Sequence, residues 1–269
     1  RSGTTIAQHQ RDDTNPERVD DFHNGGIYGR LLWRARRADV AQSARALLWY
    51  QGESDPGNSA SYGAAFKSLY DDWLVDYPQL ETVYVFQIRN VGTLCTSHDP
   101  LLREVQRRLQ DDPALPKVVL MSTTGVGPQI DGCHFPYTDG YEKIGDNIYR
   151  LIAHDLYGQS ELTNVEPPNV DFAYFKDSAR QEVAMSMRNQ VDTLIWNPGA
   201  AADFLLSDGS IDILSGSVQG NELTLTLNQG AAVGTSMHYV GHGGVNPPED
   251  DTRLDEWVTN ANGVGLLAF

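Results

Sequence analysis

The feature that most constrains the fold is an alternation of short apolar runs with helical patterns along the first 160 or so residues. Three apolar runs have the length and composition of buried strands: residues 46–50, 82–88 and 118–121. Three further stretches carry apolar side chains at helical spacing: residues 59–77, 100–109 and 141–156. Strands that alternate with helices form a parallel sheet covered on both faces, so we predict an α/β fold here.

Beyond Gly158 the helical spacing disappears, and short alternating runs separated by turn-forming residues replace it. These runs are residues 170–175, 182–187, 211–214 and 222–227. Regular short strands with turns between them are typical of a β-sandwich. The polar stretch at residues 158–168 marks the boundary. We therefore expect an α/β domain over residues 1–163 and a small, all-β, sandwich-like domain over residues 164–269.

Acidic residues outnumber basic ones, with 36 Asp and Glu against 20 Lys and Arg and a net charge of −16. Most of the excess falls on residues 165–269, which carry 4 basic and 14 acidic side chains, a net charge of −10. Nucleic acids and anionic membranes are bound by clustered cations, so this balance argues against both as partners. No uncharged apolar run approaches the ~20 residues that span a bilayer. Small molecules and neutral polymers are the expected partners.

A polar cluster follows the first predicted strand, where residues 49–55 have the sequence Trp-Tyr-Gln-Gly-Glu-Ser-Asp. Ligands of open parallel sheets gather beyond the carboxyl ends of the strands, which favours a site here. A strand end, a glycine turn and a helix cap would explain the same residues without a site. Ser54 lacks the second glycine of a G-x-S-x-G elbow and Pro56 follows closely, so we do not expect Ser54 to be a nucleophile.

A second cluster, Asp131-Gly-Cys-His134, lies in the loop between the last predicted strand and the long helix. Such a loop can fold back so that the carboxylate meets the imidazole, which fixes the tautomer and stabilises the imidazolium of a general base. The alternative is an Asx-type turn beside a surface histidine. The predicted position of the loop at the same sheet edge as Gln51 favours a catalytic pair.

Together the two clusters resemble the sialate O-acetylesterase and acetylxylan esterase group of SGNH-type hydrolases. The features that carry the resemblance occur in the family's order: the Trp-Tyr-Gln-Gly-Glu-Ser string, a Tyr-rich helix with Asp72-Trp73, the Leu-Arg-Glu-Val-Gln string at residues 102–106, and Asp131-x-x-His134. The opening at residues 3–6 is similar to the family's Gly-Gly-Thr-x-Ile segment, with Ser2 in place of the first glycine. The resemblance covers residues 1–158 and implies an SGNH-hydrolase-like, flavodoxin-like fold.

The resemblance implies a serine esterase that removes O-acetyl groups from a carbohydrate, such as sialic acid or an acetylated polysaccharide. Its mechanism would be Ser-His-Asp acyl transfer. His134 would be the general base and acid, and Asp131 would orient it. Neither a metal nor an organic cofactor is implied.

The resemblance also implies an oxyanion hole built from two separate segments. Gln51 would contribute a side-chain N–H and Gly3 a backbone N–H. Removing one such donor typically lowers the rate by ~10²–10³-fold. We expect Glu53 and Asp55 to hold the Gln51 loop rather than to react.

The nucleophile of the family is a serine in a Gly-Gln-Ser-Asn motif that precedes the Gly-Gly-Thr segment, and no Gly-Gln-Ser-Asn string occurs here. Ser2 lies in the oxyanion segment and does not match. Three explanations stay open: a shortened fragment, a missing part on a separate chain, or a catalytically silent, carbohydrate-binding relative. We favour a complementing upstream segment or chain, whose loss would remove the first strand and expose a sheet edge.

Two cysteines, Cys95 and Cys133, bear on the compartment. A disulfide between them would tie together two loops near His134 and indicate an oxidising environment, whereas two free thiols are equally compatible with the count. No secretory signal is visible. We expect an extracytoplasmic or secreted protein.

Overall fold

The computed structural model describes residues 3–55, 57–89, 100–127, 134–241 and 256–269. Contacts between Cα atoms separate the chain into two compact units. The first comprises Arg1–Ile88 and Leu101–Leu120, and the second comprises Arg89–Pro100 and Met121–Phe269. The second unit thus holds the predicted β-rich domain together with residues before it. This grouping does not test the predicted boundary after residue 163, which stays a prediction.

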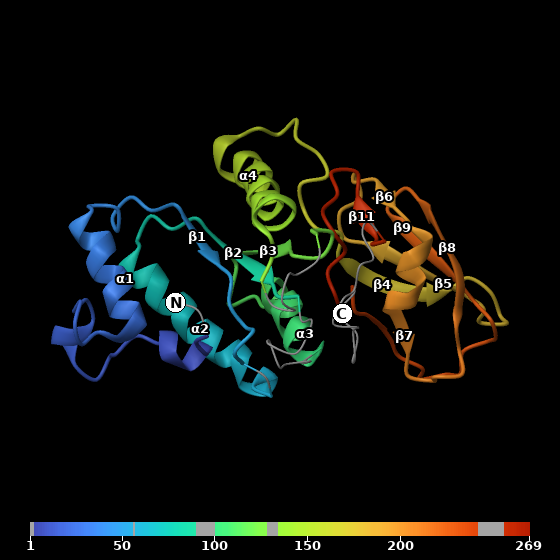
Figure 1. Ribbon diagram of the computed structural model, residues 1–269, viewed down its shortest axis with the longest axis horizontal. Helices are drawn as coiled ribbons and strands as arrows, with labels where there is room; N and C mark the ends of the chain where they lie inside the picture. The colour runs from blue at the N-terminus through green and yellow to red at the C-terminus, as the bar shows by residue number, and fades with distance from the viewer. Residues whose placement is uncertain (1–2, 56, 90–99, 128–133, 242–255) are drawn as a thin grey trace. The chain divides into compact units, whose positions relative to one another are not determined.

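The first unit is a parallel sheet with helices packed against it (Figure 1). Its elements in chain order are η1 (Ile6–His9), η2 (Pro16–Arg18), α1 (Gly26–Arg37), β1 (Ala46–Trp49), α2 (Ser59–Asp76), β2 (Thr82–Gln87), α3 (Pro100–Arg108), η3 (Leu109–Asp111) and β3 (Val118–Ser122). Strand β1 pairs in parallel with β2, and β3 lies on the other side of β2. The predicted strands and helices of this region are confirmed.

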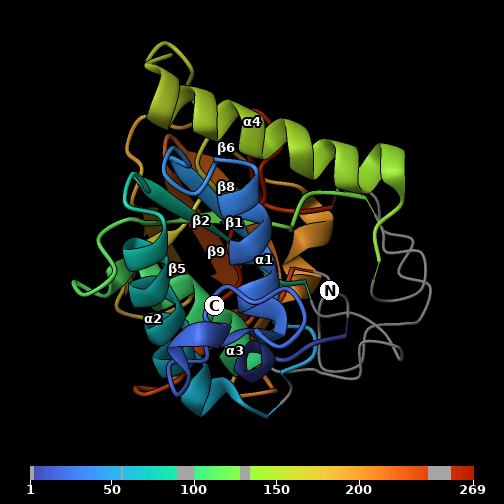
Figure 2. The same cartoon turned by 90° about the vertical axis from the view of Figure 1, so that its left-hand side faces the viewer.

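Helix α1 is not among the predicted elements, although its buried residues follow a helical spacing. Tyr28, Leu32 and Ala35 are buried and repeat at four and three residues. Three arginines in its last turn interrupt the apolar pattern, but their positive charges interact favourably with the negative end of the helix dipole. Helices α1 and α2 lie side by side (Figure 2), where the Tyr28 hydroxyl donates to Asp76 Oδ2 at 2.8 Å.

Aromatic side chains of α2 form the core beneath the sheet. Tyr62, Phe66 and Trp73 are buried, and the ring of Trp73 packs against Trp49 of β1 with centroids 5.2 Å apart. Every residue of β2 is buried. The helix stops before Pro78, as the sequence predicts. Among the described residues, no helix is both long and apolar enough to cross a membrane.

The first helices that the structure describes in the second unit are η4 (Tyr137–Tyr141) and α4 (Glu142–Tyr157). Helix α4 confirms the predicted long helix and ends at Gly158, whose φ of 69° is the left-handed conformation that favours glycine at this position. Arg89 is buried in this unit, and its guanidinium lies 5.7 Å from the ring centre of Phe135 and 5.1 Å from that of Trp257.

The remainder of the second unit is all β, as predicted. Its elements are β4 (Val170–Phe175), β5 (Glu182–Met187), β6 (Leu194–Ile195), η5 (Pro198–Asp203), β7 (Phe204–Leu206), β8 (Ile213–Gln219), β9 (Glu222–Leu227), β10 (Met237–Tyr239) and β11 (Thr259–Asn260). A four-stranded antiparallel sheet has the order β4-β5-β9-β8, and two-stranded sheets pair β10 with β7 and β11 with β6.

The core of this β-rich part lies on one face of the four-stranded sheet. Met185, Leu223 and Leu225 point into a cluster with Phe204 and Tyr239 of the smaller sheets, which gives a sandwich-like arrangement. The predicted strand at residues 211–214 lies further along the chain, at β8. Its pattern is obscured because Gly216 faces the Trp196 ring, 2.5 Å from where a Cβ would lie.

The end of the chain is joined to the loop that follows β3 within the second unit. The Gly265 N–H donates to the Thr124 carbonyl oxygen at 3.2 Å. A Cβ on Gly265 would lie 2.4 Å from the carbonyl carbon of Thr124, so this close approach of two backbones requires glycine.

Candidate active site

The polar cluster after β1 forms a tight turn that directs Gln51 into the protein. Gly52 has a φ of 146°, and a Cβ there would lie 2.9 Å from Gln106 Nε2 and 3.1 Å from Ile88 Cδ1. A larger residue would therefore be strained and would collide with both neighbours. The Asp55 N–H closes the turn by donating to the Gly52 carbonyl oxygen at 2.9 Å.

The side-chain amide of Gln51 is buried and fully engaged within the first unit. Its Nε2 donates to the Thr4 carbonyl oxygen at 3.0 Å and to Asp55 Oδ2. Its Oε1 lies 3.2 Å from the Tyr62 hydroxyl, which can donate to it. Both amide protons thus meet protein acceptors. An oxyanion can receive one of them only by taking the place of an acceptor, and the Thr4 carbonyl is the neutral one of the two.

Asp55 joins the Gln51 turn to the segment that begins at Thr4. Only 1% of Asp55 is exposed, and its Oδ2 accepts from the Ile6 N–H at 2.9 Å as well as from Gln51. A buried carboxylate needs such donors, because it is otherwise costly to remove from water. Gly3, one residue before Thr4, is exposed and has a φ of 64°. Glu53 lies half-buried on the turn.

Two polar residues that the sequence did not single out for a role complete this network. Tyr62 is fully buried on α2, and its hydroxyl lies 3.1 Å from the Gln51 carbonyl oxygen and accepts from Trp49 Nε1 at 3.2 Å. Burial raises the pKa of Tyr62, so its phenol stays neutral. Gln106 on α3 donates to the same Gln51 carbonyl at 2.9 Å and accepts from the Ile88 N–H at 3.0 Å.

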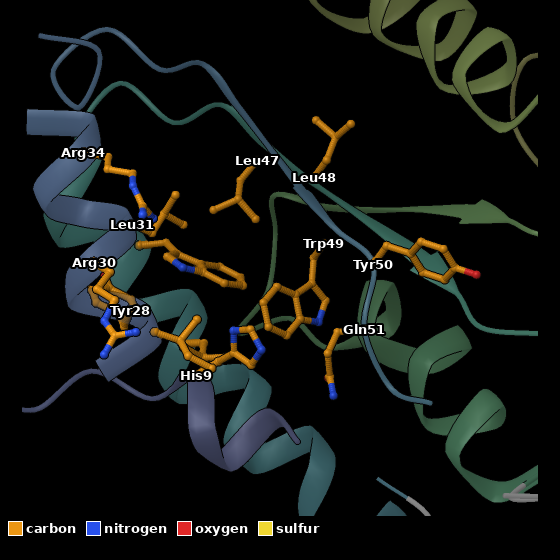
Figure 3. Close-up of a pocket in the computed structure, with 13 residues that line it drawn as sticks. His9, Tyr28, Arg30, Leu31, Arg34, Leu47, Leu48, Trp49, Tyr50 and Gln51 are labelled. Atoms are coloured by element: carbon orange, nitrogen blue, oxygen red, sulfur yellow. The ribbon is translucent and has the colours of Figure 1, made fainter. Parts of the chain in front are cut away.

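A cavity of about 560 Å³ lies along β1 in the first unit, between that strand and helices α1 and α2 (Figure 3). The rings of His9 and Trp49 meet edge to face in this cavity, with centroids 5.1 Å apart and an interplanar angle of 85°. His9 Nε2 lies 2.9 Å from the Thr4 hydroxyl, and burial lowers the pKa of this histidine. Leu48, which also lines the cavity, is 49% exposed.

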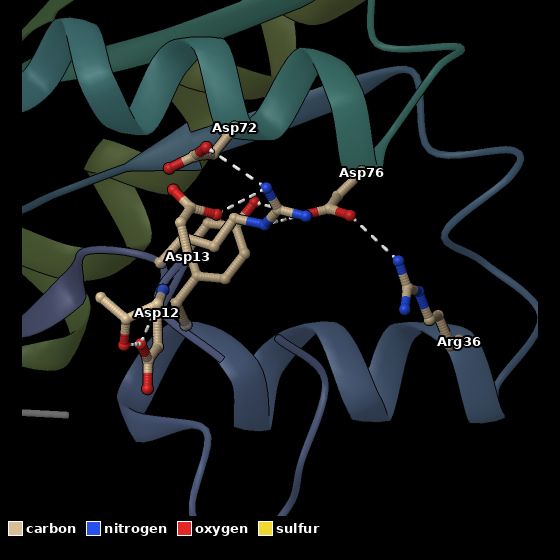
Figure 4. A network of polar contacts seen from close by, with 8 residues as sticks. Asp12, Asp13, Arg36, Asp72 and Asp76 are labelled. Atoms are coloured by element: carbon tan, nitrogen blue, oxygen red, sulfur yellow. Dashed lines mark hydrogen bonds and ion pairs between the residues drawn. The ribbon is translucent and has the colours of Figure 1, made fainter. Parts of the chain in front are cut away.

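An acidic network fastens the chain beyond His9 to α2 (Figure 4). Asp76 accepts from Arg36 Nη2 at 3.0 Å and forms an ion pair with Arg11 Nε at 3.1 Å. Arg11 Nη1 also pairs with Asp13 at 2.8 Å and lies 3.8 Å from Asp72. Burial, followed by the nearby charge of Asp13, raises the pKa of Asp72 to about 6. These contacts anchor the segment that carries Thr4 and Ile6.

His134 belongs to the second unit, where it is exposed immediately before buried Phe135. Arg89 contacts the described residues on both sides of residues 128–133, because its Nη1 donates to the carbonyl oxygens of Val126 at 3.0 Å and Gly127 at 3.1 Å and its guanidinium lies over the Phe135 ring. The sequence did not single out Arg89. Three residues of the sequence-based predictions lie outside the described residues: Asp131, Cys95 and Cys133.

The described serines include one in a Gly-Gln-Ser string, at residues 158–160. Ser160 is exposed and lies three residues beyond Tyr157, the last residue of α4, and Glu161 rather than Asn comes next. The negative end of a helix dipole disfavours the developing oxyanion that a nucleophilic serine creates. Ser54 is half-buried in the turn after Gly52. Neither serine has the setting of a nucleophile.

Residues 1–153 match a family model described as carbohydrate esterase, sialic acid-specific acetylesterase. Among solved structures, the chain is similar to a carbohydrate acetylesterase from Xanthomonas citri, with a TM-score of 0.68 and 16% sequence identity. That similarity covers 99% of this chain and 58% of the other, so this chain spans little more than half of its length. At this identity the similarity shows the fold. No curated protein sequence matches the chain.

Proposed function

Since this chain belongs to the carbohydrate esterase family of sialic acid-specific acetylesterases, we propose that it removes O-acetyl groups from a carbohydrate. Sialic acid and acetylated plant or microbial polysaccharides are the candidate substrates. The observation that carries the proposal is the buried network in which Gln51, Asp55 and the Thr4–Ile6 backbone are held together at the end of β1. It fixes the position of the candidate oxyanion donors before substrate arrives.

The proposed reaction is acyl transfer through a serine. The serine Oγ attacks the acetyl carbonyl carbon while its proton passes to His134, and the tetrahedral intermediate then expels the sugar oxygen, which takes the proton from His134. Water attacks the resulting acetyl-serine, giving its proton to His134, and acetate leaves as the serine recovers a proton. Asp131 orients the imidazole throughout.

The proposed oxyanion hole uses Gln51 Nε2 and the Gly3 N–H. Gln51 keeps one amide proton on the charged Asp55 and offers the other, which Thr4 O holds in the resting structure, to the oxyanion. A negatively charged oxygen is the stronger acceptor, because hydrogen bonds to ions are about twice as strong as those between neutral groups. This exchange would make the donor respond to charge that develops in the transition state.

We propose that the nucleophilic serine comes from a segment preceding residue 1 or from another chain. The edge of β1 supports this, because an apolar strand with half of Leu48 exposed has the composition of an interior strand of a parallel sheet. A strand added in parallel to that edge would end beside Gln51, since the carboxyl ends of parallel strands lie at one edge of the sheet.

The test is acetate release from O-acetylated sialic acid and from acetylxylan by the full-length gene product. His134→Ala should abolish release, whereas Ser160→Ala, which changes the serine at the end of α4, should leave it unchanged. Both variants should melt within a few degrees of the wild type, since both side chains are exposed. Undiminished release by His134→Ala would refute the mechanism, and loss in Ser160→Ala would transfer the nucleophile to that residue.

A second candidate is a catalytically silent, carbohydrate-binding relative. The engaged amide of Gln51 favours it, because an amide with both protons held by the protein is suited to structure as well as to catalysis. The two candidates differ in the gene upstream of Arg1. If no Gly-Gln-Ser-Asn segment is encoded there and no acetate is released, but acetylated glycans still bind in calorimetry, the silent relative is correct.

A further inference from the structure

Two exposed aromatic rings lie on the outward face of the four-stranded antiparallel sheet. Phe172 and Tyr174 alternate along the edge strand β4 and are 54% and 42% exposed. Their ring planes differ by 28°, and the ring centroids are 6.0 Å apart. Adjacent exposed rings in nearly parallel orientation form an apolar patch, and exposed apolar patches mark interaction sites.

The ring of Tyr174 lies across the sheet and does not stand away from it. Its hydroxyl donates to Glu222 Oε2 on β9 at 2.7 Å, although β5 lies between β4 and β9. Two strand spacings are about 9.6 Å, so both side chains must lean over β5 to meet. Ala184, which pairs with Tyr174 on β5, is fully buried as a result. One face of the ring is thereby turned to solvent.

The rest of this face carries Ser, Thr and Gln side chains together with the carboxylates of Glu182 and Glu222. Strand register places Ser186 of β5 directly opposite Phe172. Further across the same face, on β9 and then β8, lie these outward-facing residues: Thr224, Thr226, Ser215, Ser217 and Gln219. The one lysine beside the rings, Lys176, lies 3.5 Å from Glu222 Oε1 and 3.4 Å from the Thr224 hydroxyl. The alternate residues of β5 and β9 point into the core, so the pattern of this face follows from the strand period.

We propose that this face, defined by Phe172, Tyr174 and the hydroxyl groups beside them, binds a neutral polysaccharide chain. Pyranose rings present C–H faces that stack on aromatic rings and hydroxyls that pair with Ser, Thr and Gln side chains. Residues 165–269 carry a net charge of −10, which repels anionic polymers but leaves a neutral glycan unaffected. This face would bind the polysaccharide whether or not the protein hydrolyses it.

The test is affinity electrophoresis of the full chain in native gels that contain deacetylated xylan, with polysialic acid in parallel gels. Xylan should retard the wild type. Phe172→Ala/Tyr174→Ala should weaken xylan binding at least about tenfold, the usual order for removing aromatic anchors. Tyr174→Phe keeps the ring and should stay within about threefold of the wild type, since a hydrogen bond to an exposed side chain contributes little. Phe175→Ala, on the opposite face of β4, is the matched control and should bind as the wild type does.

Three results would each overturn the proposal. These are no retardation by xylan, equal retardation of the wild type and the double variant, and retardation by polysialic acid alone. The melting temperature of each variant separates lost binding from lost folding, and the single variant Phe172→Ala repeats the test with a smaller change. Esterase activity plays no part in the readout, so the outcome is independent of the reaction proposed above.

Discussion

The parallel sheet and the four-stranded antiparallel sheet of this protein differ in how their strands are covered. Strand β1, at the edge of the parallel sheet, has the sequence Ala-Leu-Leu-Trp and leaves 49% of Leu48 exposed beside a cavity. Strand β9, inside the four-stranded antiparallel sheet, alternates buried Leu with half-buried Thr and Glu, so one face of that sheet is a core and the other meets solvent. In an antiparallel sheet of this kind, the alternation of apolar and polar side chains lets one face pack on the core while the other meets solvent. An apolar strand of a parallel sheet instead needs other elements packed on both of its faces.

The two regions also differ in how far apart in the sequence their contacting residues lie. In the antiparallel sheet, β8 and β9 follow each other in the chain and pair directly. At the end of β1, by contrast, Gln51 is held by residues 47 and 55 positions away in the chain, Thr4 and Gln106. A change in that network should therefore affect function more than a similar change on the open face of the antiparallel sheet.

The largest expected effect is that of Asp55→Ala on acetate release by the full-length gene product. The change frees the Gln51 amide and leaves the Ile6 N–H without its acceptor, so kcat should fall by about 10²–10³-fold, as for loss of an oxyanion donor. KM should change much less, since the carboxylate acts through Gln51. Asp71→Ala, on the exposed side of α2, is the control and should keep kcat. A kcat for Asp55→Ala within twofold of the wild type would contradict the role of the network.

The edges themselves can be compared with two matched substitutions, Leu48→Lys and Leu214→Lys. Both leucines are exposed on edge strands, at 49% on β1 and 64% on β8. If another strand covers β1 in the full-length protein, Leu48→Lys should cost about 2 kcal/mol of unfolding free energy, because it buries a charge. Leu214→Lys should stay within about 0.5 kcal/mol of the wild type. Equal effects in urea unfolding would show that the two edges are alike and that β1 is uncovered.

The smallest expected effect concerns Asp72, a half-buried acidic residue of α2 in the unit that holds the parallel sheet. The pKa of Asp72 is raised from its ordinary value of 3.8 to about 6, so the folded state binds this proton more tightly than the unfolded state. Its ionisation therefore lowers stability as the pH rises from 4 to 6.

Asp72→Asn should remove that dependence. It should raise the unfolding free energy at pH 7.5 by about 1 kcal/mol, a value reduced for partial exposure, and change it little at pH 4. Urea unfolding at both values is the measurement, with Asp71→Asn as the control on the same helix. A variant less stable than the wild type at pH 7.5 would show that the pairing of Asp72 with Arg11 outweighs the cost of burial.

Most of the fold was predictable because the spacing of apolar residues within each strand or helix is visible in a short stretch of sequence. The strands at β1, β2 and β3 and the helices α2 and α4 follow from runs of apolar residues that a neighbouring proline or glycine ends. Helix α1 was not predicted, because arginines dilute its apolar stripe. The strand β8 was displaced, since Gly216 takes the place of an inward-facing side chain beneath Trp196.

The site was predictable only in part, because its contacts join distant segments. The resemblance pointed to Gln51 and Asp55, but nothing local shows that one Asp55 oxygen serves both Gln51 and Ile6. Tyr62 carries the helical period of a core residue, and its hydroxyl gives no sequence pattern of its own. Arg89 follows a strand as any loop residue can, and its two aromatic partners lie 46 and 168 residues further along the chain.

The contacts of Arg89 with both Phe135 and Trp257 have a consequence for how such a protein can be rebuilt. Phe135, next to His134, and Trp257, in the last stretch of the chain, both lie close to the Arg89 guanidinium, and that last stretch is also hydrogen-bonded to Thr124 after β3. The β-rich part therefore cannot be exchanged independently of the residues that precede it in the second unit. An exchange with the corresponding part of a relative must retain Trp257 together with Phe135, or Arg89 loses one of its two aromatic contacts.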